Sequence, residues 1–225
     1  MLNQSRGFSL VELMVAMVAG LLLVAAASAL FATILKANKT AMQVSRLNQE
    51  LQAVTDMIAR DIQRAGYDAS AATHTLNAGV SGAILLLPFY FDSTQHLLNK
   101  YSSSPDKYRC IALKYDERDV NAPSPGQPGA NEAVVYSLRT DSSIWLDELS
   151  ASASSAALAT ACSNGGNRIS TNDTIEITDL TFTLISGSVS TGARTIRLAI
   201  SGNDKNSPAL KLSLQRDIKL RNDGF

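Results

Sequence analysis

The chain has 225 residues and a mass of 24.0 kDa, enough for one globular domain with an additional segment or for two small domains. With 18% charged and 45% apolar residues, it is neither an acidic disordered chain nor a polytopic membrane protein. Lys+Arg and Asp+Glu number 20 each, so the basic excess that neutralises phosphates is missing and no nucleic-acid partner is expected.

The first element in the chain is a long apolar segment. After a polar start, no charged side chain occurs from Leu13 to Leu35, a run of 23 residues. As an α-helix this run is about 35 Å long, enough to cross a hydrocarbon core of about 30 Å. Glu12 lies at its beginning, where an unpaired carboxylate costs several kcal/mol. Glu12 is therefore a candidate functional residue, the alternative being a side chain that reaches the membrane interface.

A cleavable secretory signal is an alternative for the same segment. Residues 1–29 have a basic start, an apolar centre and small-residue sites at 25–27 and 27–29, as such signals do. Against this alternative, the apolar run is longer than that of an ordinary signal, contains Glu12 and continues to Leu35.

A helical periodicity continues beyond the apolar segment. No Pro or Gly interrupts residues 21–65, and Gly66 stands where a glycine commonly ends a helix. We therefore predict one helix of roughly 85 Å over residues 8–65. The apolar residues of its second part recur at steps of three and four; they are Val44, Leu47, Leu51, Val54, Ile58 and Ile62.

The two predicted halves of this helix require different surroundings. Residues 8–35 are apolar all round and require lipid or partner helices, whereas residues 36–66 are amphipathic and require a globular domain on one side. The ion pairs expected at i,i+4 are Asp56 with Arg60 and Arg46 with Glu50.

After Gly66, residues 67–225 show short β-rich runs separated by turn residues. Apolar and polar residues alternate in the later runs, which predicts an antiparallel sheet with one covered face. The amphipathic half of the helix is its natural cover, so the fold class is α+β, a helix packed on a sheet. The candidate strands are Ala83–Phe91, Arg109–Tyr115, Ala133–Arg139, Thr174–Ile185, Arg194–Ser201 and Leu210–Leu220.

Two stretches between these strands differ in composition. Asn121–Asn131 holds three of the six prolines and is predicted to be an irregular excursion. Ser150–Ser163 consists mainly of small residues and is interpreted as a short surface helix or a loop. Asn203–Asn206 is typical of a hairpin turn.

We find no arrangement of residues that predicts catalysis, a metal site or a bound cofactor, and we expect that the chain is not an enzyme. His74 and His96 are interpreted as surface histidines. The run Asp116–Asp119 could offer oxygen ligands to calcium, but a solvated turn is favoured because the EF-hand glycine and glutamate are missing. Trp145 is interpreted as a core anchor.

The sequence RGFSLVELMVAM at residues 6–17 resembles the cleavage and methylation signature of type IV prepilins and the related pseudopilins. The resemblance implies that residues 1–7 are a leader, that a prepilin peptidase cuts between Gly7 and Phe8, and that it methylates the new amino group of Phe8. It also implies that Glu12, the fifth residue of the mature chain, pairs with the terminal amine of a neighbouring subunit, which would compensate its charge.

Further segments resemble, more specifically, the PilW family of minor type IV pilins. With them, the resemblance covers nearly the whole chain. Major pilins commonly have a kinking proline in the apolar half of the helix, whereas the first proline here is Pro88, which favours a minor component. The segments that carry the resemblance are residues 60–67 and 110–116, Trp145, Cys162, and residues 179–182 and 217–222.

The resemblance implies a type IV pilin-like fold and a minor pilin that helps to initiate a pilus and sits at its tip, in support of adhesion or twitching motility. The implied partners are other minor pilins, the major pilin, the prepilin peptidase, inner-membrane lipid before assembly and a tip adhesin. The implied location is the bacterial inner membrane, with the C-terminal domain in the periplasm, and then the pilus. The alternatives are a minor pseudopilin of type II secretion and, in a different class, an exported binding domain with a signal anchor.

Cys110 and Cys162 are the only cysteines. In a domain outside the cytoplasm such a pair is expected to form one disulfide. It would close a loop of about fifty residues and contribute about 3–4 kcal/mol. The alternative is two separate buried thiols.

Overall fold

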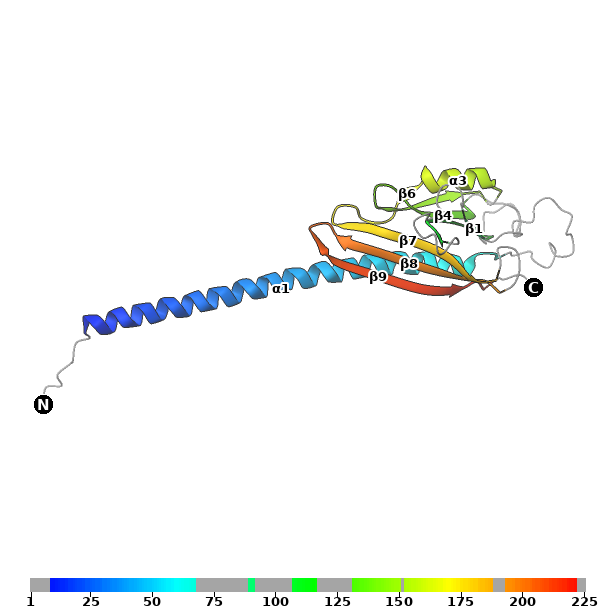
Figure 1. Ribbon diagram of the computed structural model, residues 1–225. Coiled ribbons are helices and arrows are strands. Elements are labelled where there is room, and N and C mark those ends of the chain that lie inside the picture. Colours follow the sequence, from blue (N-terminus) through cyan, green and yellow to red (C-terminus); the bar gives the residue numbers. More distant parts are fainter. Residues whose placement is uncertain are drawn as a thin grey trace, which may run out of the picture. The chain divides into compact units, whose positions relative to one another are not determined.

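The computed structural model describes residues 9–67, 89–91, 107–116, 131–150, 152–187 and 193–221. Its described residues fall into two compact units, with the division between Ser45 and Arg46. One helix, α1 (Leu10–Arg64), contributes to both units, and all the strands belong to the second (Figure 1).

The end of α1 is fixed by the backbone of the domain. Gly66 has φ +79°, a left-handed conformation that glycine adopts without a Cβ penalty. Its N–H donates to the carbonyl of Lys114 at 2.8 Å, and the N–H of Asp116 donates to the carbonyl of Tyr67 at 2.8 Å. The helix therefore ends within two residues of the predicted position, and the chain after it joins a strand.

The strands form two antiparallel sheets, where the sequence predicted one. The first has the order β1-β3-β4-β5-β6 and the second has the order β2-β7-β8-β9. The strands of the first sheet are β1 (Phe89–Phe91), β3 (Cys110–Lys114), β4 (Ala133–Leu138), β5 (Ile144–Leu149) and β6 (Asn167–Arg168). Those of the second are β2 (Lys107–Tyr108), β7 (Ile175–Ser186), β8 (Thr195–Asp204) and β9 (Ser207–Lys219).

A single main core joins the second half of α1 to both sheets. Gly202 in β8 lies close to the helix, since a Cβ placed there would be 3.4 Å from a methyl carbon of Leu51 and 3.5 Å from one of Leu47. Five of the six predicted apolar residues of α1 lie in this core, and Val44, the first of them, does not because it is 41% exposed. The α1 residues of the core, all at most 4% exposed, are Leu47, Leu51, Val54, Ile58 and Ile62, joined by Ala59. The predicted amphipathic face is thus the face that the strands cover.

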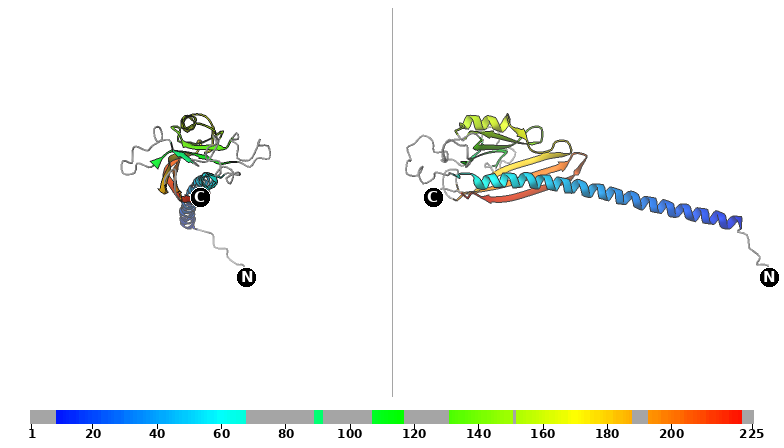
Figure 2. Two further views of the ribbon diagram at one scale, coloured as in Figure 1. Left: turned by 90° about the vertical axis from the view of Figure 1, so that its right-hand side faces the viewer. Right: turned by 180° about the vertical axis from the view of Figure 1, so that it is seen from behind.

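A second, smaller core lies on the other face of the first sheet. The short helix α3 (Ser155–Ser163) covers it, so that this sheet lies between α3 and the second half of α1 (Figure 2). Ser154 caps α3, because its side chain accepts a hydrogen bond from the N–H of Ala157 at 3.3 Å. Of the two interpretations of the small-residue stretch, the helix is the one that the structure contains.

Several local predictions were wrong. Asp116 is 2% exposed, not part of a solvated turn, because its backbone joins the chain that leaves α1. Trp145 on β5 is half-buried and belongs to neither core; its ring lies 4.3 Å from the Arg139 guanidinium carbon. Residues 117–130, which hold most of the proline-rich stretch, and the histidines at 74 and 96 lie outside the described residues.

The acidic residues of the expected ion pairs along α1, Asp56 and Glu50, bond to a strand and a loop instead. Asp56 pairs with Arg216 of β9 at 2.5 Å, while Arg60 donates to the backbone carbonyl of Asp56 at 3.2 Å. Glu50 accepts hydrogen bonds from the N–H and hydroxyl of Thr171. These long-range partners fix the helix against the domain, which pairs within the helix could not do.

Candidate assembly site

The start of α1 is organised around Glu12. Its carboxylate accepts the backbone N–H of Ser9 at 3.0 Å, and the Ser9 side chain accepts the N–H of Val11 at 3.4 Å. This arrangement is close to a capping box, with the N–H of the second helical residue bonded in place of the third, and it satisfies backbone donors that a helix start leaves free. Glu12 also lies in the first turn, where the helix dipole favours a negative charge. Gly7 and Phe8, the implied processing site, lie outside the described residues.

Around and beyond Glu12, the side chains of the first unit point into open space. The large apolar side chains between Leu10 and Leu35 are 48–74% exposed, and α1 includes an apolar window long enough to cross a membrane. Glu12 is the only charged residue in this stretch until Lys36. A surface of this kind is stable only in lipid or against other apolar helices, which would surround the Glu12 carboxylate with a low dielectric.

Gly20 makes one part of this surface suitable for close helix packing. A Cβ placed at Gly20 would meet no atom within 4 Å among the rest of the chain, so the absence of a side chain there serves no packing within the described residues. Together with Ala16, one turn earlier, it forms the small-residue spacing that lets two helix backbones approach.

The second unit supplies a rigid domain. Cys110 of β3 and Cys162 of α3 form a disulfide with a Cα–Cα distance of 5.7 Å, in place of the alternative of two separate thiols. Both sulfur-bearing residues are fully buried in the smaller core. The link therefore holds α3 on the sheet and gives this face a fixed shape.

A buried polar contact holds the first sheet against α1. The hydroxyl of Tyr136 on β4 donates to the Asp61 carboxylate at 2.5 Å, and Arg64 lies 3.9 Å from the same carboxylate and stacks over the ring of Tyr115 at 4.2 Å. Burial first, and then the Asp61 charge, raises the pKa of Tyr136 above its usual range. The hydroxyl thus remains protonated and able to donate.

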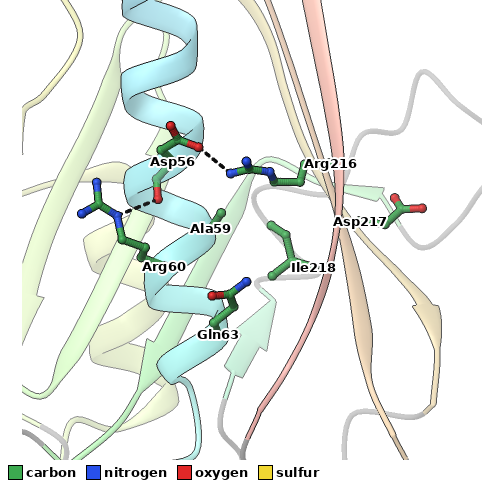
Figure 3. A pocket seen from close by; sticks show the side chains of 7 residues that line it. All are labelled: Asp56, Ala59, Arg60, Gln63, Arg216, Asp217 and Ile218. Carbon is green, nitrogen blue, oxygen red and sulfur yellow. Dashed lines mark hydrogen bonds and ion pairs between the residues drawn. The ribbon is translucent and has the colours of Figure 1, made fainter.

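A groove of about 410 Å³ runs between the second half of α1 and β9 (Figure 3). Its charges are largely paired: Arg216 with Asp56 at 2.5 Å, and Asp217 with Arg197 of β8 at 2.7 and 2.8 Å. Nothing in the sequence indicated this groove, because its residues lie more than 150 positions apart. Among the described residues, no three His, Cys, Asp or Glu side chains gather where they could hold a metal ion.

Two comparisons with protein families match the chain. The family described as "Prepilin peptidase-dependent protein B" matches residues 40–220, and the "Prokaryotic N-terminal methylation motif" matches residues 2–28. No curated protein and no solved structure matches it. The two matches together cover the start of the chain with most of the apolar half of α1 and, separately, the rest of the helix with the strands that follow.

Proposed function

Because the chain belongs to the family of prepilin peptidase-dependent protein B, a type IV pilin-like group processed by a prepilin peptidase, we propose that it is a minor pilin that helps to start the assembly of a type IV pilus and sits at its tip. The proposed role is structural: the chain supplies binding surfaces rather than a catalytic centre. Its proposed partners are other minor pilins, the major pilin and a tip adhesin.

The observation that carries the proposal is the placement of Glu12. Its carboxylate is the one charge in a helical surface that is otherwise apolar until Lys36, and this surface is exposed in the isolated chain. In a bundle of such helices an unpaired carboxylate would be strongly unfavourable. The amino group of Phe8 in a neighbouring subunit, freed by cleavage after Gly7, would supply the compensating positive charge.

Assembly then follows from burial. Before assembly, lipid of the inner membrane covers the apolar half of α1, with the domain in the periplasm. On assembly, helices of neighbouring subunits replace the lipid, and close packing at Gly20 and the Glu12 pair supply the directional contacts. The absence of a proline before Pro88 supports the minor role, since a bulk subunit of this class commonly has a kinked helix.

The first experiment measures the N-terminal sequence and the intact mass of the membrane-extracted chain, in cells with and without their prepilin peptidase. We expect a mature chain that starts at N-methylated Phe8 only when the peptidase is present. A start near Ser28 or Leu30, or an unprocessed Met1, would overturn the proposal in favour of an exported domain with an ordinary signal.

A second experiment separates the two kinds of machine. Deletion of the gene is expected to abolish surface pili and to leave type II secretion intact, and the chain without its disulfide or with Glu12→Ala should fail to restore piliation. Loss of secretion with normal pili would identify a minor pseudopilin instead.

A further inference from the structure

The outer edge of β9 is the longest strand edge that the described residues leave unpaired. β9 is the last strand of its sheet and pairs only with β8, and it extends over 13 residues. The end strands of the other sheet, β1 and β6, have 3 and 2 residues. An unpaired edge offers a row of backbone donors and acceptors to which another extended chain can bond.

The register shows which residues face outward. Leu220 donates its N–H to the carbonyl of Arg194 at 3.1 Å, so this is a hydrogen-bonded pair of the ladder. Because such pairs alternate along antiparallel strands, the even-numbered residues of β9 bond to β8 and the odd-numbered ones direct N–H and C=O to the edge. No hydrogen bond from another described residue reaches these outward groups of Lys211, Ser213, Gln215, Asp217 and Lys219.

The next odd residue confirms this direction and shows where the edge stops being open. Arg221 donates its N–H to the backbone carbonyl of Gln63 in α1 at 3.4 Å, so the helix covers the edge there. Towards Asp217 the helix and the strand separate into the groove of about 410 Å³, and the Gln63 side chain points into it (Figure 3). The groove leaves space beside β9 for a further backbone.

The charges on this edge indicate what can bind. Arg216 and Asp217 are neutralised by Asp56 and Arg197. Lys211 and Lys219 are exposed, and neither has an ionic partner among the described residues. Both belong to the outward-bonding set and lie on the same face of the strand, so each would be directly opposite a side chain of an added strand.

We propose that the free edge of β9 binds an extended segment of another subunit of the same filament, by strand addition, with acidic side chains of that segment opposite Lys211 and Lys219. Pairing with a second copy of this chain is unfavourable in the register that overlaps the two open edges most fully. Two antiparallel β9 strands centred on Gln215 would place Lys211 opposite Lys219, and like charges directly opposite are unfavourable. The inference rests on the proposed function only in taking the partner to be a filament subunit.

The test is photo-crosslinking of the full chain in the bacterium that makes it. The photoreactive residue p-benzoylphenylalanine replaces Ser213 on the open edge or, as a control, Asn167 on β6 of the other sheet. Mass spectrometry then identifies the crosslinked peptide. We expect an adduct from position 213, and not from position 167, with an acid-containing extended segment of another filament subunit.

Substitutions on β9 test whether its lysine side chains and its outward backbone groups contribute to the adduct. Lys211→Glu together with Lys219→Glu should reduce the adduct about tenfold, because two attractive cross-strand pairs become repulsive. The charge reversal Arg168→Glu on β6 should leave it unchanged. Gln215→Pro removes an outward N–H without breaking the ladder to β8 and should also reduce the adduct. Thermal unfolding of each variant shows that a loss is not caused by unfolding.

The inference is wrong if position 213 gives no adduct, gives an adduct only with a second copy of this chain, or gives one that the two glutamates do not weaken. The N-terminus of the same purified chain is determined in parallel. A chain that starts at Phe8 but forms no adduct overturns the docking site alone, whereas an unprocessed chain overturns the proposed function.

Discussion

The two units of this chain contain parts of one helix, and the side chains of those parts differ in exposure to solvent. Up to Ser45, hardly any side chain of α1 is even partly covered, and the large apolar ones of residues 10–35 are at least 48% exposed. From Leu47 to Ile62, one side of the same helix is at most 4% exposed and packs on two sheets. The comparison teaches that the second unit folds around its own core, whereas the first is complete only when lipid or other subunits surround it.

The largest expected effect is on incorporation into filaments, and the substitution that tests it lies in the first unit alone. Glu12→Ala should leave cleavage after Gly7 intact but should reduce incorporation into filaments about a hundredfold or more, because breaking a buried charge pair costs about 3–5 kcal/mol. The measurement is the ratio of filament-bound to membrane-bound processed chain. Glu50→Ala, which removes the acceptor of Thr171 in the second unit, is the control and should mainly lower domain stability. Normal incorporation of the Glu12 variant would contradict the charge-pairing mechanism.

Removal of the disulfide tests the stability of the second unit. Cys110→Ser should lower the free energy of unfolding by about 3–4 kcal/mol, since the bond joins residues 52 positions apart. Urea unfolding of the full chain in detergent, followed by circular dichroism, measures this. Processing at the N-terminus should be unaffected. An unchanged unfolding midpoint would mean that the smaller core holds α3 without the covalent link.

A matched pair of leucines compares the units directly. Leu51→Ala removes a fully buried side chain and should cost about 3 kcal/mol. Leu22→Ala, at a position 67% exposed, should not change the unfolding of the domain at all. Equal effects of the two substitutions in the same urea titration would show that the apolar half of α1 is packed in the isolated chain and does not lie exposed.

A smaller effect is expected where α1 meets the first sheet. Tyr136→Phe deletes the hydroxyl that donates to Asp61 and leaves that mostly buried carboxylate with one donor fewer, at a cost of about 2 kcal/mol. Tyr67→Phe, at a ring 38% exposed, is the control. If both variants unfold like the unsubstituted chain, the contact does not stabilise the docking of the helix.

The smallest effect is a pH dependence at Asp179 on β7. Desolvation raises the pKa of its carboxyl, although the Arg109 charge partly opposes this. The folded state therefore binds the proton more tightly than the unfolded state, so this group lowers stability as the pH rises above about 4. Asp179→Asn should stabilise the domain by about 0.5 kcal/mol or less at pH 7, because water screens the half-exposed group, and by nothing at pH 3. A gain that is equal at both pH values would refute the assignment.

The parts of the fold that a local pattern controls could be predicted from the sequence. The C-terminal limit of α1 follows from Gly66 and from the absence of Pro and Gly in residues 21–65. All six candidate strands overlap observed ones, although residues 83–88 of the first lie outside the described residues, and the last three were recognised because their residues alternate. β5 was missed since its residues IWLDEL alternate poorly, and the two-residue strands β2 and β6 leave no pattern. The division into two sheets could not be predicted, because it depends on which strands pair.

In the candidate assembly site, too, one part could be predicted from the sequence and another part could not. Glu12 is conspicuous in sequence because a charge interrupts an apolar run. Its capping bond to Ser9 follows from a spacing of three that many helix starts share. By contrast, the open edge of β9 depends on the order of the strands, and its groove depends on α1 lying beside β9. No local pattern links residues so far apart in sequence.

The long sequence separation between α1 and β9 has a consequence for how the domain folds. The apolar face of α1 from Leu47 to Ile62 is covered in part by Ile218 and Leu220, which lie more than 150 positions later in the chain. Until β9 is in place, this face lacks part of its cover. The main core is therefore complete only when β9 has joined the sheet, and a chain truncated before β9 would expose part of the same leucines and isoleucines to aggregation or proteolysis.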